Sequence, residues 1–240
     1  TLFRSSAASD VYKRQGYMRM YHHKYLELLR EACTKFNVHL IADEIAVGFG
    51  RTGTMFGFEQ AKITPDIICL SKGITGGYMT LSTILTTDDI YDTFYDEYEK
   101  LNAFLHSHSY TANPIACSAA NATLDLFKKM KVIENNKKLS LHMKKCFESL
   151  NDHPHVSDVR QKGMVLAIEL VKNKKKKLAY DWKERRGIKA YLHGLKNNVL
   201  MRPLGNVLYF MPPYVITKKE ISFVSEIMKE GVDEATKKSS

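Results

Sequence analysis

The chain has 240 residues, of which 44% are hydrophobic, and a formal net charge of +10. This length permits one large domain or two small ones with a real core. No apolar run approaches the ~20 residues that a membrane-spanning helix needs, so the sequence predicts no membrane span. A basic chain can bind nucleic acid. The lysines that carry much of this charge, however, have no aromatic residues among them, so we interpret them as a solvated surface.

The cysteines are scattered, without C-x-x-C spacing, and lie among apolar neighbours. This pattern predicts buried thiols in a reducing compartment, which places the protein in the cytoplasm, and it predicts neither disulfides nor a metal site. The four residues are Cys33, Cys69, Cys117 and Cys146.

Residues 1–15 have no initiator Met and no strong periodicity. We expect this segment to be a non-native or unstructured tail, and we leave it out of the fold prediction.

The next segment predicts one helix followed by strands. Residues 23–37 place Leu26, Leu29, Cys33 and Phe36 on one apolar stripe, which indicates a helix. Residues 38–42 and 67–70 are apolar strands, and residues 81–85 form a third. This order predicts a mostly parallel sheet covered on both faces, with ligands beyond the carboxyl ends of its strands.

The remaining sequence predicts a smaller α+β domain after another helix. Asn113 and Pro114 are typical of a helix N-terminus, with Asn as the cap. We expect this helix to pack through a face of Ile115, Ala119, Ala122 and Leu126. We assign residues 16–132 to a larger domain and residues 133–240 to the smaller one. The smaller domain is predicted to contain a helix at 133–150, strands within 156–171, a helix at 180–197, a hairpin formed by 199–202 and 207–211, and a last helix that begins with a capping box at Thr217 and Glu220.

Two polar residues lie at the carboxyl ends of predicted strands. Asp43 follows the strand at 38–42, and Lys72 follows the strand at 67–70. An enzyme that uses pyridoxal 5'-phosphate needs a lysine to bond to the aldehyde and an aspartate to keep the pyridine nitrogen protonated. Two simpler interpretations remain open: the aspartate caps the next helix, and the lysine is solvated.

The residues around this pair resemble the cofactor signature of class III aminotransferases. The similar segments are 43–53, Pro65-Asp66 and 70–73. Residues 16–22, 104–116 and 201–214 extend the resemblance, which runs from about Gly16 to near the C-terminus. Ala46 is typical of the members that transfer an amino group from S-adenosylmethionine to 8-amino-7-oxononanoate in biotin synthesis, giving 7,8-diaminononanoate. Members that act on ornithine or 4-aminobutyrate usually carry Gln there.

The resemblance implies an α/β chain of fold type I, pyridoxal 5'-phosphate as cofactor and a homodimer with small-molecule substrates, without a nucleic acid or membrane partner. It also implies a C-terminal fragment, because the chain begins where the large domain of the family is about half built. We therefore expect these residues alone to be inactive. Two alternatives remain open: a class III enzyme with another amino donor, such as lysine, and a non-catalytic basic binding module.

The resemblance also assigns roles to individual residues. Asp43 pairs with the pyridine nitrogen, and Lys72 carries the covalent and proton-transfer steps. Ile45 is placed by its spacing instead: it follows Asp43 by two residues and faces the same side of the strand, so it packs on the ring or is an ordinary core residue. Arg51 lies near the cofactor pocket, where it binds substrate or forms a structural ion pair.

Three further roles follow in the same way. Ser109, with Tyr110 beside it, reaches the cofactor phosphate of the neighbouring subunit. Arg202 binds the carboxylate of the acceptor through its planar fork, and Tyr209 lies near the substrate tunnel. The family often has Pro and Gly at 108 and 112, where this chain has His and Ala.

An H-x-H pattern at His106 and His108 invites a zinc hypothesis. No third ligand follows at useful spacing, so we predict no metal site.

Overall fold

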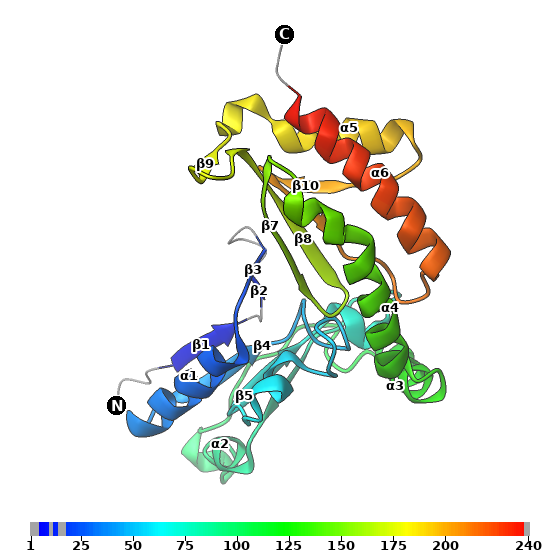
Figure 1. Cartoon of the computed structure of the whole chain (residues 1–240). Helices are drawn as coiled ribbons and strands as arrows, with labels where there is room; N and C mark the ends of the chain where they lie inside the picture. The colour runs from blue at the N-terminus through cyan, green and yellow to red at the C-terminus, as the bar shows by residue number, and fades with distance from the viewer. Residues whose placement is uncertain (1–4, 10–11, 14–17, 238–240) are drawn as a thin grey trace. The chain divides into compact units, whose positions relative to one another are not determined.

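Figure 1 shows the computed structural model of the chain, which describes residues 5–9, 12–13 and 18–237. The chain divides into two compact units. Unit 1 comprises Thr1–Val11, Tyr21–Phe49 and Thr54–Lys131, and unit 2 comprises Tyr12–Met20, Gly50–Gly53 and Val132–Ser240. Two short segments from the first half of the sequence thus belong with the second half.

Unit 1 is built on a four-stranded sheet with the order β1-β4-β5-β6. The strands are β1 (Ser5–Ser9), β4 (His39–Asp43), β5 (Ile67–Leu70) and β6 (Thr83–Thr86). The first three are parallel and β6 is antiparallel to β5, so the predicted mostly parallel sheet is confirmed. β1 lies within the segment that we expected to be a tail, so residues 5–9 of that segment take part in the sheet.

Helix α1 (His23–Lys35) packs near β4 through part of the predicted stripe. Leu26 and Cys33 form a buried cluster with Leu40 of β4 and Ala61. Phe36, which we expected on the same stripe, is 69% exposed because α1 ends at Lys35 and Phe36 is its C-cap.

Unit 1 also contains short helical segments and one long helix. These are η1 (Gly57–Ala61), η2 (Lys72–Thr75), α2 (Asp88–Asp92), η3 (Tyr98–Lys100) and α3 (Pro114–Lys129). The side chain of Asn113 accepts hydrogen bonds from the first turn of α3, which confirms the predicted cap. The expected apolar face, with Ile115 and Leu126, was wrong: both are exposed, and Ala116 and Ala120 are the buried positions.

Unit 2 is an antiparallel sheet packed against helices. Its strands follow the order β10-β11-β8-β7, and β9 pairs with β8. The strands are β7 (Val156–Lys162), β8 (Val165–Asn173), β9 (Leu178–Ala179), β10 (Arg202–Leu204) and β11 (Val207–Phe210). Two further strands, β2 (Tyr12–Lys13) and β3 (Arg19–Met20), pair with each other in antiparallel orientation.

The helices of unit 2 share one core with this sheet. They are α4 (Val132–Phe147), η4 (Glu148–Asp152), η5 (Trp182–Glu184), α5 (Arg186–Lys196) and α6 (Lys218–Thr236). Phe147 of α4, Ile168 of β8 and Met228 of α6 are among the buried members of the core. The capping box at Thr217 and Glu220 is present at the start of α6, as predicted.

Helix α5 begins six residues after the predicted start at residue 180. The side chain of Asp181 accepts the backbone N–H of Lys183 and begins η5 instead. Arg185 then adopts a left-handed conformation with φ 50°, and such a residue does not continue a right-handed helix. The predicted helix is therefore broken into a short turn and α5.

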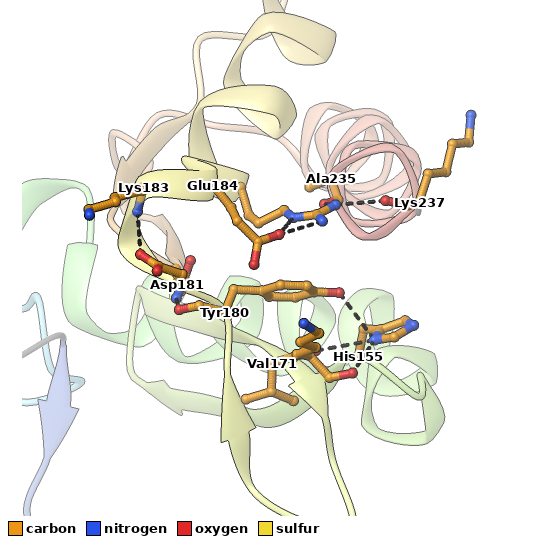
Figure 2. A network of polar contacts seen from close by, with 11 residues as sticks. His155, Val171, Tyr180, Asp181, Lys183, Glu184, Ala235 and Lys237 are labelled. Atoms are coloured by element: carbon orange, nitrogen blue, oxygen red, sulfur yellow. Dashed lines mark hydrogen bonds and ion pairs between the residues drawn. The ribbon is translucent and has the colours of Figure 1, made fainter. Parts of the chain in front are cut away.

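The first residue of α5, Arg186, connects that helix to the end of α6. Figure 2 shows its partners Glu184, Ala235 and Lys237. Arg186 is 5% exposed, and its Nη1 donates to the carbonyl oxygens of Ala235 (2.9 Å) and Lys237 (2.6 Å). Its Nε and Nη2 both donate to Glu184, and its guanidinium lies 4.6 Å from the ring of Tyr180. One buried cation thus satisfies carbonyl groups at the C-terminus of α6.

We predict that Arg186→Leu destabilises unit 2 by about 3 kcal/mol, because it leaves Glu184 and two carbonyls without their donor. Chemical denaturation of the variant and the parent protein measures the difference. Hydrogen bonding to Arg186 lowers the pKa of Glu184, so this contribution is present above the ordinary glutamate pKa of about 4.3 and fades as the pH falls below it.

Lys183→Leu is the matched control, because Lys183 is a neighbouring but exposed cation. Its effect should stay below about 0.5 kcal/mol. Equal losses in the two variants would contradict a specific role for Arg186.

Candidate active site

The two residues that the sequence singled out lie at the same edge of the unit 1 sheet. Asp43 is the last residue of β4, and its register partner on the parallel strand β5 is Cys69. Lys72 comes three residues after Cys69 and opens the turn η2. Asp43 is half-buried and Lys72 is exposed, so a carboxylate and a primary amine follow two adjacent strands.

The Asp43 carboxylate acts on its surroundings in two ways. Its Oδ1 accepts the backbone N–H of Ile45 at 3.0 Å within a turn, and no helix begins there, so Asp43 is not the helix cap that we left open. Burial, and secondly the charge of Asp43, raises the pKa of the Cys69 thiol. The negative charge at the end of β4 therefore contributes to the raised pKa of the thiol on β5.

A close contact fixes the segment after Asp43 against the turn that begins with Lys72. A Cβ atom on Gly73 would lie 2.9 Å from the Cβ and Cδ2 atoms of Phe49, which real Cβ atoms do not tolerate. Phe49 is 3% exposed and shares a buried cluster with Leu70, Ile74 and Ala120. Glycine at position 73 thus lets the Lys72 turn rest directly on the ring of Phe49.

Glu44 has a structural role that sequence reasoning missed. Its buried carboxylate accepts the backbone N–H groups of Gly57 (3.0 Å) and Phe58 (3.1 Å), which stabilises the start of η1. Successive side chains of an extended chain point to opposite sides, so Asp43 and Glu44 serve different partners. This alternation of side chains is the sequence signal that could have revealed the separate role of Glu44.

Ser109 and Tyr110 lie in the irregular segment between η3 and α3, and both are exposed. The backbone N–H of Tyr110 donates to Nδ1 of His108 at 3.1 Å, and that of His108 donates to Thr111. No hydrogen bond joins Ser109 to Asp43 or Lys72 in the part of the chain that the structure describes.

The other candidate residues belong to unit 2, where the structure brings two of them together. Arg202 of β10 and Tyr209 of β11 are direct register partners across the hairpin. Side chains of directly opposed residues in an antiparallel pair lie on the same face. Arg202 is exposed and Tyr209 is 9% exposed, so this face presents a guanidinium beside a buried ring.

Arg51 is bound by groups that sequence reasoning missed. Its Nη1 donates to the carbonyl oxygen of Pro212 at 2.7 Å, and its guanidinium carbon lies 4.3 Å from the centroid of the Tyr214 ring. Pro212 is 161 residues away in the sequence, so no local pattern could reveal the contact. Among the described residues Arg51 forms no ion pair, in contrast to the structural ion pair considered above.

No helix within residues 18–237 combines the length and the apolar character needed to cross a membrane. Nor do three or more His, Cys, Asp or Glu side chains gather into a possible metal site in the described ranges.

Known proteins resemble the chain over nearly its whole length. The Aminotransferase class-III profile matches residues 13–232. Adenosylmethionine-8-amino-7-oxononanoate aminotransferase of Helicobacter pylori is 46% identical over 234 residues, which cover 96% of this chain and 52% of that protein. The enzyme of the same name from Geobacter sulfurreducens is 42% identical over 212 residues, covering 88% and 47%. The chain thus spans about half the length of these relatives.

A solved structure shows the same relationship. The crystal structure of adenosylmethionine-8-amino-7-oxononanoate aminotransferase from Methanocaldococcus jannaschii superimposes with a TM-score of 0.91 at 39% identity, covering 96% of this chain and 53% of that one. This similarity confirms the predicted α/β architecture of fold type I. Together with the match over residues 13–232, it shows that the chain belongs to the class III aminotransferase family.

Proposed function

We propose that the whole protein transfers an amino group from S-adenosylmethionine to 8-amino-7-oxononanoate, giving 7,8-diaminononanoate, with pyridoxal 5'-phosphate as cofactor. The observation that carries this proposal is the position of Asp43 and Lys72 after two register-paired parallel strands. The names of the relatives supply the donor and the acceptor. All four cysteines are free thiols, which fits the cytoplasm.

The chemistry of the two side chains fits the cofactor. Its aldehyde needs a primary amine, which Lys72 offers, and its pyridinium N–H needs a carboxylate, which Asp43 offers. When bound, pyridoxal 5'-phosphate supplies an electron sink for the amino group transfer. The residues of the chain then bind and orient the cofactor and move the proton.

Each residue has a defined task in this proposal. Asp43 uses Oδ1 for the N–H of Ile45, while its Oδ2 has no hydrogen-bond partner among the described residues and serves the pyridine nitrogen. The Lys72 amine would hold the cofactor covalently through its aldehyde, with release of water, and would move a proton during the transfer. Ile45 packs on the ring, because it lies two residues after Asp43.

Substrate recognition falls to the residues of unit 2. Arg202 binds the carboxylate of 8-amino-7-oxononanoate, because a planar guanidinium can donate two parallel hydrogen bonds to it. Tyr209, its register partner, lines the same face with an apolar ring. Arg51 adds a second cation for an anionic group of a substrate.

We predict that Lys72 is the single site of covalent cofactor attachment. Borohydride reduction of the loaded protein, followed by peptide mass spectrometry, should place the label on the Lys72 peptide. Lys72→Ala should abolish both the label and the formation of 7,8-diaminononanoate. Lys62→Ala is the matched control, because Lys62 is also exposed in unit 1 and also has a positive φ. A label shared among several lysines would contradict the assignment.

We predict that Asp43→Asn lowers the turnover number by at least about 100-fold, since the amide cannot hold the pyridine nitrogen protonated. A second measurement needs no cofactor. Removing the charge of Asp43 removes one of the two causes that raise the pKa of Cys69, so Cys69 should alkylate at lower pH in the variant. Unchanged alkylation of Cys69 would show that its thiol does not sense Asp43.

The surface of unit 1 supports a homodimer. Residues 78–110 expose many large apolar side chains, among them Tyr78 (89% exposed), Tyr98 (86%) and Leu105 (94%). Many exposed large apolar side chains within one segment suggest a surface that another chain covers. Ser109 and Tyr110 lie in the same segment, so a second copy that covers it would receive these residues near its own cofactor site.

We predict that Lys72→Ala and Ser109→Ala subunits complement each other in a mixed dimer. If Ser109 serves the partner's site, this heterodimer keeps one site with both residues intact and recovers activity. The matched control pairs a wild-type subunit with a Lys72→Ala/Ser109→Ala subunit, which leaves no intact shared site. Activity in the control but not in the mixed dimer would show that Ser109 acts within its own subunit.

A further inference from the structure

Arg51 differs from the other arginines that the structure shields from solvent. Arg30 lies 2.7 Å from Asp66, Arg160 lies 2.6 Å from Glu169, and Arg186 lies 2.6 Å from Glu184. Arg51 is half-buried, yet its contacts are a neutral carbonyl and a neutral ring. Within residues 18–237 no carboxylate neutralises its charge.

The two contacts fix the guanidinium without using most of its donors. All five N–H groups of a guanidinium point outward in its own plane, and none points along the normal to that plane. The centroid of the Tyr214 ring lies 4.3 Å from the guanidinium carbon, and the Pro212 carbonyl accepts a hydrogen bond from Nη1. The remaining donors keep a fixed direction, as the recognition of a carboxylate requires.

The backbone of Arg51 is held independently of its side chain. Its carbonyl accepts the N–H of Met164 at 2.9 Å, at the turn between β7 and β8. Gly163 in that turn has φ 54°, and a Cβ there would lie 2.4 Å from the carbonyl carbon of Thr52. Ser140 of α4 donates to the carbonyl of Gly163 at 2.8 Å and so fixes the turn itself.

The Tyr214 ring is suited to this contact because it stays uncharged. Burial raises the pKa of Tyr214 to about 12, even though the neighbouring Arg51 cation lowers it. The phenol is thus neutral at physiological pH, and it orients Arg51 without pairing with its charge.

We propose that Tyr214 is the positioning residue of Arg51: its ring, with the Pro212 carbonyl, aims the free edge of the guanidinium at a carboxylate of the substrate. This inference rests on the proposed function, which makes Arg51 a substrate contact. It adds a residue that does not itself touch the substrate. It also implies that the substrate carries a carboxylate group, which is bound in a defined orientation.

The test compares Tyr214→Phe, which keeps the ring, with Tyr214→Leu, which removes it, in the whole protein loaded with cofactor. Tyr214→Leu should raise KM for the carboxylate substrate by about 10-fold, with a smaller change in kcat, and Tyr214→Phe should stay within about twofold of the parent. In an Arg51→Met background, Tyr214→Leu should add nothing. Phe223→Leu, which alters an exposed aromatic of α6, is the control.

Two measurements do not depend on activity. Phenylglyoxal should label the Arg51 peptide several-fold faster in Tyr214→Leu than in Tyr214→Phe, and exposed Arg202 should label equally in both. Hydrogen exchange at the Met164 amide should stay unchanged, because the backbone contact does not involve Tyr214.

The outcomes separate the two proposals. If the Met164 amide loses its protection from hydrogen exchange in Tyr214→Leu, Tyr214 has a structural role, and the inference is overturned. Equal KM effects with and without Arg51 would overturn it as well. A parent protein that forms no 7,8-diaminononanoate would instead refute the proposed function, and the labelling of Arg51 would still decide whether Tyr214 positions it.

Discussion

The contact between Gly73 and the ring of Phe49 is the constraint on which the candidate active site depends. Asp43 and Lys72 belong to different strands, and parallel pairing alone places only the backbones of β4 and β5 in register. The chain after each strand is free to diverge. Phe49, seated in a buried cluster and pressed against Gly73, fixes the two following segments to each other. The backbone segments that carry the carboxylate and the amine are thereby held in a constant relation.

The two units contain different kinds of sheet, and each sheet positions a different group of candidate site residues. In unit 1 the parallel strands end at one edge, where they place the residues that suit the proposed cofactor. In unit 2 an antiparallel hairpin sets Arg202 and Tyr209 opposite each other, and the segment beyond β11 receives Arg51. The groups that suit carboxylates are therefore organised by cross-strand pairing and by the residues that continue from it.

Local sequence patterns predicted the elements well, because those elements depend on neighbours in the chain. The strand at 67–70, the Asn113 cap and the capping box of α6 are set by interactions within a few residues. The same reasoning placed Asp43 and Lys72 at strand ends. It was wrong about Phe36 and the buried face of α3, since a period of 3.6 residues shows that a face exists but not which face meets the core.

The contacts that sequence reasoning missed are the ones that join distant segments. Nothing near Arg51 in the sequence points to Pro212 or Tyr214, and nothing near Arg186 points to the carbonyl of Ala235. The late start of α5 was also missed. Position 185 adopts a left-handed conformation but carries Arg, and not the Gly or Asn that would indicate such a conformation in the sequence. Such features follow from packing, which a single sequence does not display.

The membership of Gly50–Gly53 in unit 2 bears on how such proteins can be recombined. The β7–β8 turn accepts this short segment against Gly163, a position with no room for any side chain. Residues 132–240 are therefore not a cassette that can be cut at one point and exchanged between homologues. In a chimaera that takes its second half from another aminotransferase, the β7–β8 turn comes from one parent and residues 50–53 come from the other. The turn is then not matched to the segment that packs against it. Crossover points that keep positions 50–53 and 163 from the same parent respect that match.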